Sequence, residues 1–194
     1  GTTNAPACVA PPGGNKPILG TNPISMSVPT ENNEIAFQFD QSTSAIAIGK
    51  IRVAAANGEQ IPNGWAVDKD GCPTTNPEEA LKGSLLSSGG YKGFGFGLMA
   101  EILASALTGS LSSVNAPPLK TTEGDPHDLG QTYILIDPKF NGKNDHFFEQ
   151  LNNLADLISL QTNARLPGSN KNNPSEIEID KDLWDLVNQL DGSY

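Results

Sequence analysis

The sequence predicts an α/β domain in which helices cover a mostly parallel, possibly mixed β-sheet. Two observations support this: short apolar runs closed by Pro or Asp indicate strands, and longer segments with helical spacing alternate with them. A third is length, because 194 residues suffice for one domain with a substantial core. We expect residues 1–194 to form this single domain, with many loops since the chain contains 20 glycines and 15 prolines.

Three segments are expected to form strands. Apolar runs at residues 24–28, 35–39 and 133–136 each stop at Pro or Asp. Helices are expected over the Ala/Gly-rich residues 45–56 and 94–107, over residues 147–158 with their amphipathic spacing, and from residue 180, where Asp180 can cap. Residues 110–130 are rich in proline and lack periodicity, which predicts a long excursion, and residues 176–194 should form a C-terminal strand and helix.

Charge and cysteine content exclude several classes of protein. A net charge of −10 without a basic run argues against nucleic-acid binding. The uncharged run at residues 102–119 is interrupted by Ser, Asn and Pro, so no membrane helix is expected. Cys8 and Cys72 are far apart and lack metal-ligand spacing, which favours free thiols in a reducing, cytoplasmic compartment.

The most informative segment is residues 89–97, Gly-Gly-Tyr-Lys-Gly-Phe-Gly-Phe-Gly. Five glycines allow close approach of a ligand, Lys92 supplies a cation, and a helix beginning here would present its positive end. The segment matches neither common nucleotide motif, because Leu98 replaces the last glycine of the dinucleotide fingerprint and no Gly-Lys-Ser/Thr follows. The alternative is that these glycines only let a helix pack closely against a sheet.

Four other blocks accompany this loop in order along the chain. They are Pro-Ile-Leu-Gly-Thr-Asn-Pro-Ile at residues 17–24, Asp-Gln-Ser-Thr-Ser at 40–44, Trp-Ala-Val-Asp-Lys-Asp-Gly-Cys-Pro-Thr-Thr at 65–75, and Arg-Leu-Pro-Gly at 165–168. Together, over nearly the whole chain, they resemble the malate/L-lactate dehydrogenase family outside the Rossmann class, whose relatives include sulfolactate, ureidoglycolate and diketogulonate dehydrogenases. The resemblance implies a layered helix/mixed-sheet/helix domain of a non-Rossmann, NAD(P)-binding type.

The resemblance also implies which residues hold the cofactor. They are expected in four places: Thr3 and Asn4 at a strand end, the turn with Asp40, Gln41 and Ser42, the glycine loop with Lys92 and Gly93, and the turn with Arg165, Pro167 and Gly168. Each place has a structural alternative: a disordered chain start, helix capping by Asp40 or Ser42, a solvated lysine, and a helix stop. Relatives usually carry another residue at Gln41.

The family's catalytic histidine lies in a Ser-His pair of an N-terminal helical segment, which would precede Gly1. This chain has only His127 and His146, neither in such a motif. We therefore expect a C-terminal, cofactor-side portion without a catalytic residue of its own. His127 is expected to be an exposed loop residue, and no metal site is expected. Lys50 and Arg52 either attract a substrate carboxylate or form surface pairs.

The implied activity is hydride transfer between a nicotinamide cofactor, NAD with NADP possible, and a small 2-hydroxy or 2-keto acid, in a homodimer. This chain alone should be inactive. The alternative is a truncated or diverged member that keeps the fold as a binding module. A secreted sugar- or metal-binding β-domain fits the Gly/Asn/Thr content but not the helices.

Overall fold

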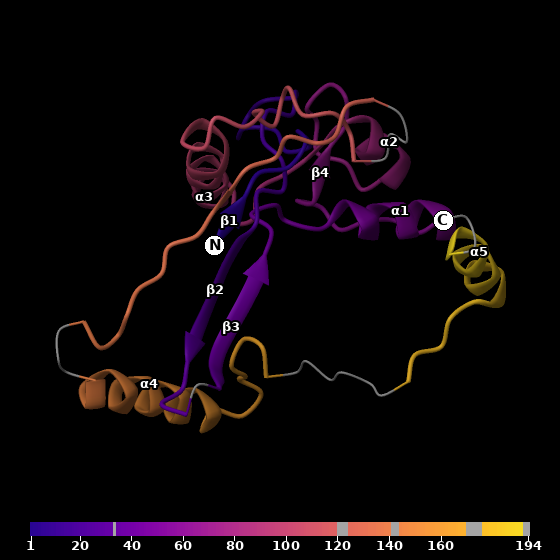
Figure 1. The fold of residues 1–194 in the computed structure, drawn as a ribbon. Helices are drawn as coiled ribbons and strands as arrows, with labels where there is room; N and C mark the ends of the chain where they lie inside the picture. Colours follow the sequence, from indigo (N-terminus) through magenta and orange to yellow (C-terminus); the bar gives the residue numbers. More distant parts are fainter. Residues whose placement is uncertain (33, 120–123, 141–143, 170–175, 192–194) are drawn as a thin grey trace.

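The computed structural model describes residues 1–32, 34–119, 124–140, 144–169 and 176–191. Its larger sheet has the order β3-β2-β1-β6, formed by β1 (Thr2–Thr3), β2 (Ile24–Pro29), β3 (Ile35–Gln41) and β6 (Gln131–Thr132). A second sheet joins β4 (Ala66–Val67) to β5 (Ser84–Leu85). Figure 1 shows the β2–β3 hairpin projecting away from the part of the molecule that contains β1, β4 and the helices at residues 48–57, 77–82 and 91–101.

The hairpin confirms the strands predicted at residues 24–28 and 35–39. Its register runs from Ile24 opposite Gln41 to Val28 opposite Phe37. The rings of Phe37 and Phe39 meet edge to face with centroids 5.8 Å apart.

The α/β class is confirmed, but the expectation of a mostly parallel sheet is wrong. All strand pairs of the two sheets are antiparallel: β2 and β3 form a hairpin, whereas β1 pairs with β2 and β6, and β4 with β5, across longer stretches of chain. The parallel pairing seen in the described residues is an isolated bridge between Val9 and Leu85.

The helices are α1 (Ile48–Asn57), α2 (Pro77–Lys82), α3 (Tyr91–Glu101), α4 (Asn144–Ser159) and α5 (Lys181–Asp191), with a π-helical turn, η1 (Ile102–Ala106), continuing α3. The four predicted helices are thus confirmed, with α1 beginning three residues later than expected. At the start of α5, Asp180 Oδ1 accepts hydrogen bonds from the backbone N–H groups of Asp182 and Leu183, at 3.0 and 3.2 Å. Residues 176–180 contain no strand.

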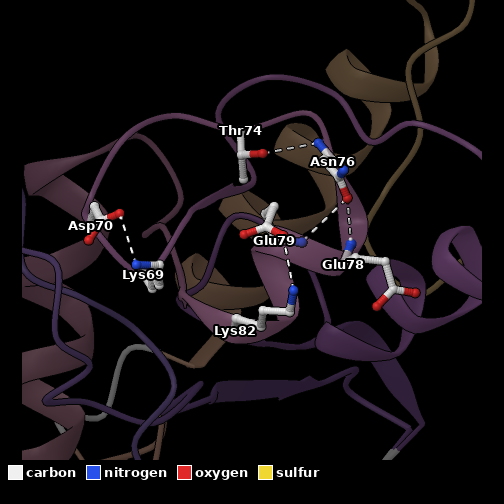
Figure 2. A network of polar contacts seen from close by, with 7 residues as sticks. All are labelled: Lys69, Asp70, Thr74, Asn76, Glu78, Glu79 and Lys82. Atoms are coloured by element: carbon white, nitrogen blue, oxygen red, sulfur yellow. Dashed lines mark hydrogen bonds and ion pairs between the residues drawn. The ribbon is translucent and has the colours of Figure 1, made fainter.

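Helix α2 was not predicted, although its signals are in the sequence. Asn76 Oδ1 accepts from the N–H groups of Glu78 and Glu79 at 2.9 and 3.3 Å, and a proline occupies the first helical position (Figure 2). The Lys82 ammonium lies 3.0 Å from a Glu79 carboxylate oxygen. Acidic residues in the first turn and a lysine in the last complement the helix dipole.

The main core lies between α1, α2 and the small sheet. It is formed by the buried side chains of Val9, Leu19, Ile51, Ala54, Ile61, Ala66, Ala80 and Leu85. Helices α4 and α5 lie away from this core. In the view of Figure 1, α4 crosses the tip of the β2–β3 hairpin, and α5 is drawn near one end of α1. Leu183, Trp184, Leu186 and Val187 of α5 are all exposed.

The strand predicted at residues 133–136 is absent. Tyr133, Ile134, Leu135 and Ile136 continue β6 without ladder pairing, and their exposed fractions are 68–91%. A run of apolar, β-branched and aromatic residues favours a strand, but a strand requires a neighbour to pair with.

Candidate functional site

Two of the predicted cofactor-binding segments meet where β3 ends. The backbone N–H of Ala45 donates to Leu86 O at 2.7 Å, and that of Ser88 donates to Thr43 O at 2.9 Å. Ser44 and Ser87 form a bridge between these hydrogen bonds. The chain leaving β3 after Asp40 and Gln41 therefore lies beside the chain that enters the glycine loop.

The helix-capping alternative for Asp40 and Ser42 is wrong. The residue that precedes α1 is Ala47, and no side chain caps that helix. Asp40 belongs to β3, and Ser42 Oγ is 3.0 Å from Ser44 Oγ. Tertiary pairing with residues 86–88 extends the chain past Gln41 and delays the helix. Asp40 and Gln41 are left exposed at the strand end.

The glycines of the loop have three different roles. Gly89 and Gly90 have φ values of 63° and 66°, and a Cβ on either would meet nothing within 4 Å. A Cβ on Gly93 would collide with the Ser88 carbonyl oxygen, and one on Gly97 would lie 2.9 Å from Thr43 Oγ1. Gly95 faces open space. Helix packing thus explains Gly93 and Gly97, whereas Gly89 and Gly90 form an open turn.

This turn leads directly into the N-terminus of α3. Gly90 is the residue before the helix, no side chain caps it, and the first turn contains no acidic residue. The first N–H groups of a helix lack intrahelical acceptors and carry partial positive charge. Lys92 lies exposed in this first turn. Open glycine backbone, helix N–H groups and one cation match the requirements of a phosphate group.

The third predicted segment lies against the outer edge of β3. The N–H of Gln38 is 3.4 Å from Pro167 O, and a Cβ on Gly168 (φ 91°) would be 2.9 Å from Gln38 O. A cavity of about 190 Å³ opens between residues 35–38 and 166–169. Arg165, which directly precedes the lining residue Leu166, is exposed. The Arg-Leu-Pro-Gly turn is therefore brought to β3, the strand that contains Asp40 and Gln41.

Thr3 and Asn4 are ordered, and their side chains bind other parts of the chain. Asn4 is 1% exposed, with Nδ2 donating to Leu111 O at 2.8 Å and Oδ1 accepting from Gly130 N at 2.9 Å. Thr3 Oγ1 donates to Gly130 O at 2.8 Å. The alternative of a disordered start is wrong. Asn4 therefore holds the excursion in place through both ends of its buried amide.

Sequence reasoning missed a buried polar cluster that holds α3, which we call the Asn22 cluster: Asn22, Glu101 and Ser113. Asn22 is fully buried, and its Nδ2 donates to Gly97 O at 3.0 Å and to Glu101 Oε2 at 2.8 Å. Ser113 Oγ donates to the same carboxylate at 2.5 Å, and its N–H donates to Glu101 Oε1 at 2.6 Å. The signal was Glu101, the single charge in the apolar run at residues 94–107, because such a carboxylate needs partners.

The structure does not bring the remaining candidate residues together into a site. Lys50 and Arg52 are exposed on α1, and His146 is exposed on α4. His127 is half-buried rather than exposed, and its buried Nε2 has no hydrogen-bond partner in the described part of the chain. Within the described ranges, no three His, Cys, Asp or Glu side chains are grouped to hold a metal.

Cys8 and Cys72 are free, as predicted. Burial raises the pKa of the Cys8 thiol from 9.0 to about 11. None of the helices in the described ranges combines the length and hydrophobicity needed to cross a bilayer.

Comparison with known proteins places this geometry in a family. Residues 1–187 match the family model described as malate/L-lactate dehydrogenase. A Δ1-pyrroline-2-carboxylate reductase of Ancylobacter novellus is 40% identical over 84% of this chain and 48% of its own length. A malate/(S)-sulfolactate dehydrogenase of Methanothermus fervidus is 37% identical over 97% of this chain and 57% of its own.

A solved structure, sulfolactate dehydrogenase from Methanocaldococcus jannaschii, matches with a TM-score of 0.86 at 34% identity, over 98% of this chain and 57% of that chain. The chain thus spans about half the length of the curated relatives it matches. Because the family model covers residues 1–187, this chain belongs to the malate/L-lactate dehydrogenase family of oxidoreductases.

Proposed function

We propose that this chain is the cofactor-side portion of a nicotinamide-dependent oxidoreductase that acts on a small 2-hydroxy or 2-keto acid. The observation that carries the proposal is the joining of residues 42–45 to residues 86–88, which places the end of β3 beside the open turn of Gly89 and Gly90. The bound nicotinamide would accept or donate a hydride at C4, and the substrate would exchange it at C2.

The described residues divide the binding of a dinucleotide between them. The cofactor's diphosphate fits the N-terminus of α3, with Lys92 supplying charge and the glycines allowing close approach. Asp40, Gln41 and Ser42 would contact the cofactor from the adjoining turn, and residues 165–168 from the far edge of β3. Gly93 contributes indirectly by packing α3 against Ser88, and Asn4 by fixing the excursion. These are positioning roles.

The choice of cofactor and the choice of substrate are part of the proposal. NAD is favoured because the chain is acidic and has few cations near these loops, with NADP as the alternative. One relative, from Chromohalobacter salexigens, is named a (2R)-3-sulfolactate dehydrogenase of NADP(+), and others are reductases of pyrroline or piperideine carboxylates. The substrate set to test therefore includes malate, lactate, sulfolactate and cyclic 2-imino acids.

The proton for this reaction would come from outside the 194 residues. Neither His127 nor His146 lies beside the loops that meet at residues 42–45 and 86–88 in any described contact. We therefore expect this chain to bind cofactor without turnover by itself. An enzyme-like rate of malate or lactate oxidation by the isolated chain would contradict this part of the proposal.

We further propose that the functional assembly is a cytoplasmic homodimer. The chain exposes 13708 Å², against about 8,800 Å² expected for a compact monomer of its mass. Exposed apolar side chains on α4 and α5 account for part of this excess. Two free thiols suit a reducing compartment. A strictly monomeric chain in light scattering would count against the dimer.

The alternative, a binding module without turnover, shares every feature above, and the exposed apolar surface favours it as a partner surface. Titration with NADH and NADPH, followed by energy transfer from Trp65 and Trp184, tests whether these loops bind the cofactor. Saturable binding that weakens about tenfold in Lys92→Gln supports the proposal. The matched control is Lys82→Gln, because Lys82 is paired with Glu79 on the distant helix α2. Binding unchanged in both variants, or absent in the native chain, would contradict the assignment of the diphosphate to α3.

A further inference from the structure

Thr43 joins two segments of the chain that lie beside the turn after β3. Its N–H donates to Thr21 O at 2.9 Å, and its carbonyl oxygen accepts from Ser88 N at 2.9 Å. Its hydroxyl donates to the same Thr21 O at 3.0 Å and to Asn22 O at 3.3 Å. The side chain is half-buried, and all three polar groups of Thr43 are bonded within the chain.

The Thr43 side chain also lies against α3 at Gly97. A Cβ on Gly97 would be 2.9 Å from Thr43 Oγ1 and 3.7 Å from Thr43 Cβ, so a glycine is what lets the helix come this close. Thr43 is β-branched and its hydroxyl is held by two carbonyl oxygens, which together fix its rotamer. The hydroxyl oxygen is therefore a fixed stop for the middle of α3.

A second contact reaches the same helix through Ser88. A Cβ on Gly93 would collide with the Ser88 carbonyl, and the N–H of Ser88 is the group that donates to Thr43 O. Gly93 and Gly97 are four residues apart, so they lie on one face of α3, separated by about 6 Å along its axis. Helix α3 is thus held at two points, by the side chain of Thr43 and, through Ser88, by its backbone. Two such points fix both the depth and the tilt of the helix.

The position of α3 decides where its first N–H groups lie. The helix begins at Tyr91, two residues before Gly93. The turn with Asp40, Gln41 and Ser42 directly precedes Thr43 in the sequence. A shift of α3 away from Thr43 would therefore change the spacing between this turn and the N-terminus of the helix. Hydrogen bonds weaken steeply when their geometry departs from the ideal, so a ligand that contacts both segments would lose affinity.

We propose that Thr43 is a positioning residue that sets the depth of α3 beside the turn at residues 40–42, and thereby the affinity of the α3 N-terminus for the cofactor. The statement about affinity rests on the proposed function, because it requires the diphosphate to bind at α3. The statement about depth rests on the hydrogen bonds of Thr43 and on the contacts at Gly93 and Gly97.

The first test compares Thr43→Val, which keeps the shape but removes the hydroxyl, with Thr43→Ser, which keeps the hydroxyl. NADH should bind about tenfold more weakly to Thr43→Val and within about threefold of the native affinity to Thr43→Ser. The matched control is Asn76→Ala, which removes the cap of α2 (Figure 2) and should lower the melting temperature by about 2–4 °C, as Thr43→Val does, without weakening NADH binding. Equal affinity in the two Thr43 variants would overturn the statement about affinity.

Amide hydrogen exchange tests the depth of α3 without any cofactor. The N–H of Ser88 donates to Thr43 O, and the N–H of Phe94 makes an early hydrogen bond of α3. Both amides should exchange at least about tenfold faster in Thr43→Val than in Thr43→Ser, whereas the amide of Glu59, bonded at the end of α1, should exchange equally in both. Equal exchange at Ser88 and Phe94 would overturn the role of Thr43, whether or not NADH binds.

Gly97→Ala gives the reciprocal test, as a double-mutant cycle with Thr43→Ala. In the native background the added methyl meets Thr43 Oγ1, so the melting temperature should fall. In the Thr43→Ala background this oxygen is gone and alanine's helix propensity remains, so the melting temperature should no longer fall. A fall of equal size in both backgrounds would overturn the contact. A native chain that does not bind NADH but shows the expected exchange contradicts the proposed function and supports the role of Thr43 in placing α3.

Discussion

Two glycines of helix α3 offer a matched pair of substitutions with opposite expected effects. Gly93→Ala and Gly95→Ala make the same chemical change two residues apart in one helix. A Cβ at Gly95 would meet nothing within 4 Å, whereas a Cβ at Gly93 would collide with Ser88 O and lie 2.8 Å from Ser88 C and 2.9 Å from Ser88 N. All three atoms at Gly93 are backbone, which cannot turn aside as a side chain can.

The magnitudes follow from the two environments. Alanine is favoured over glycine inside a helix by about 0.5–1 kcal/mol, and Gly95→Ala should gain this amount. Gly93→Ala gains the same propensity but forces α3 away from Ser88, an overpacking cost of about 3 kcal/mol. The net loss is about 2 kcal/mol. At about 2–4 °C per kcal/mol for a chain of this size, the melting temperature should rise by about 1–4 °C in Gly95→Ala and fall by about 4–8 °C in Gly93→Ala.

Thermal unfolding followed by circular dichroism measures both variants under identical conditions. Gly97→Ala adds an intermediate point, because its nearest contact is the Thr43 side-chain oxygen at 2.9 Å, which can move by giving up its hydrogen bonds to Thr21 O and Asn22 O. The expected order of stability is Gly95→Ala, native, Gly97→Ala, Gly93→Ala. If Gly93→Ala is as stable as Gly95→Ala, α3 does not pack against Ser88 as described and the reasoning is refuted.

Three further substitutions or reagents test other parts of the structure. Asn22→Asp keeps the shape but replaces the donor that faces Glu101 with an acceptor, so urea unfolding should show a loss of about 3 kcal/mol. Cys8 should react with a thiol reagent far more slowly than Cys72 at pH 8, because its raised pKa leaves about one hundredth of the usual thiolate; equal rates would contradict its burial. Asp180→Ala should cost α5 about 1 kcal/mol, visible as faster amide exchange in that helix alone.

The sequence predicted local structure well where local signals decide it. The alternating run at residues 24–28 became β2, and the apolar spacing around Leu151 became α4. Prediction failed where pairing with a segment distant in sequence determines the local backbone conformation. The chain after Asp40 stays extended because it pairs with residues 86–88. The residues around Asp40 contain no sequence signal for that pairing.

The candidate site shows the same division. Glycine positions flagged the loop, but only the structure separates Gly93, which packs against Ser88, from Gly89 and Gly90, which form an open turn. Asn4 was assigned to the cofactor by family resemblance, and in the structure its buried amide bonds to Leu111 and Gly130. A side chain's partners depend on residues more than a hundred positions away, and spacing in sequence does not encode them.

The failed strand at residues 133–136 is explained by the lack of a pairing partner among the described residues. Sequence composition favours a strand there, and the register of Thr2 with Thr132 brings the run to the edge of the sheet. Exposure of Tyr133, Ile134, Leu135 and Ile136 follows because no described strand pairs with them. The prediction was therefore wrong because the composition of a segment favours a strand but does not supply the neighbouring strand with which its backbone could pair.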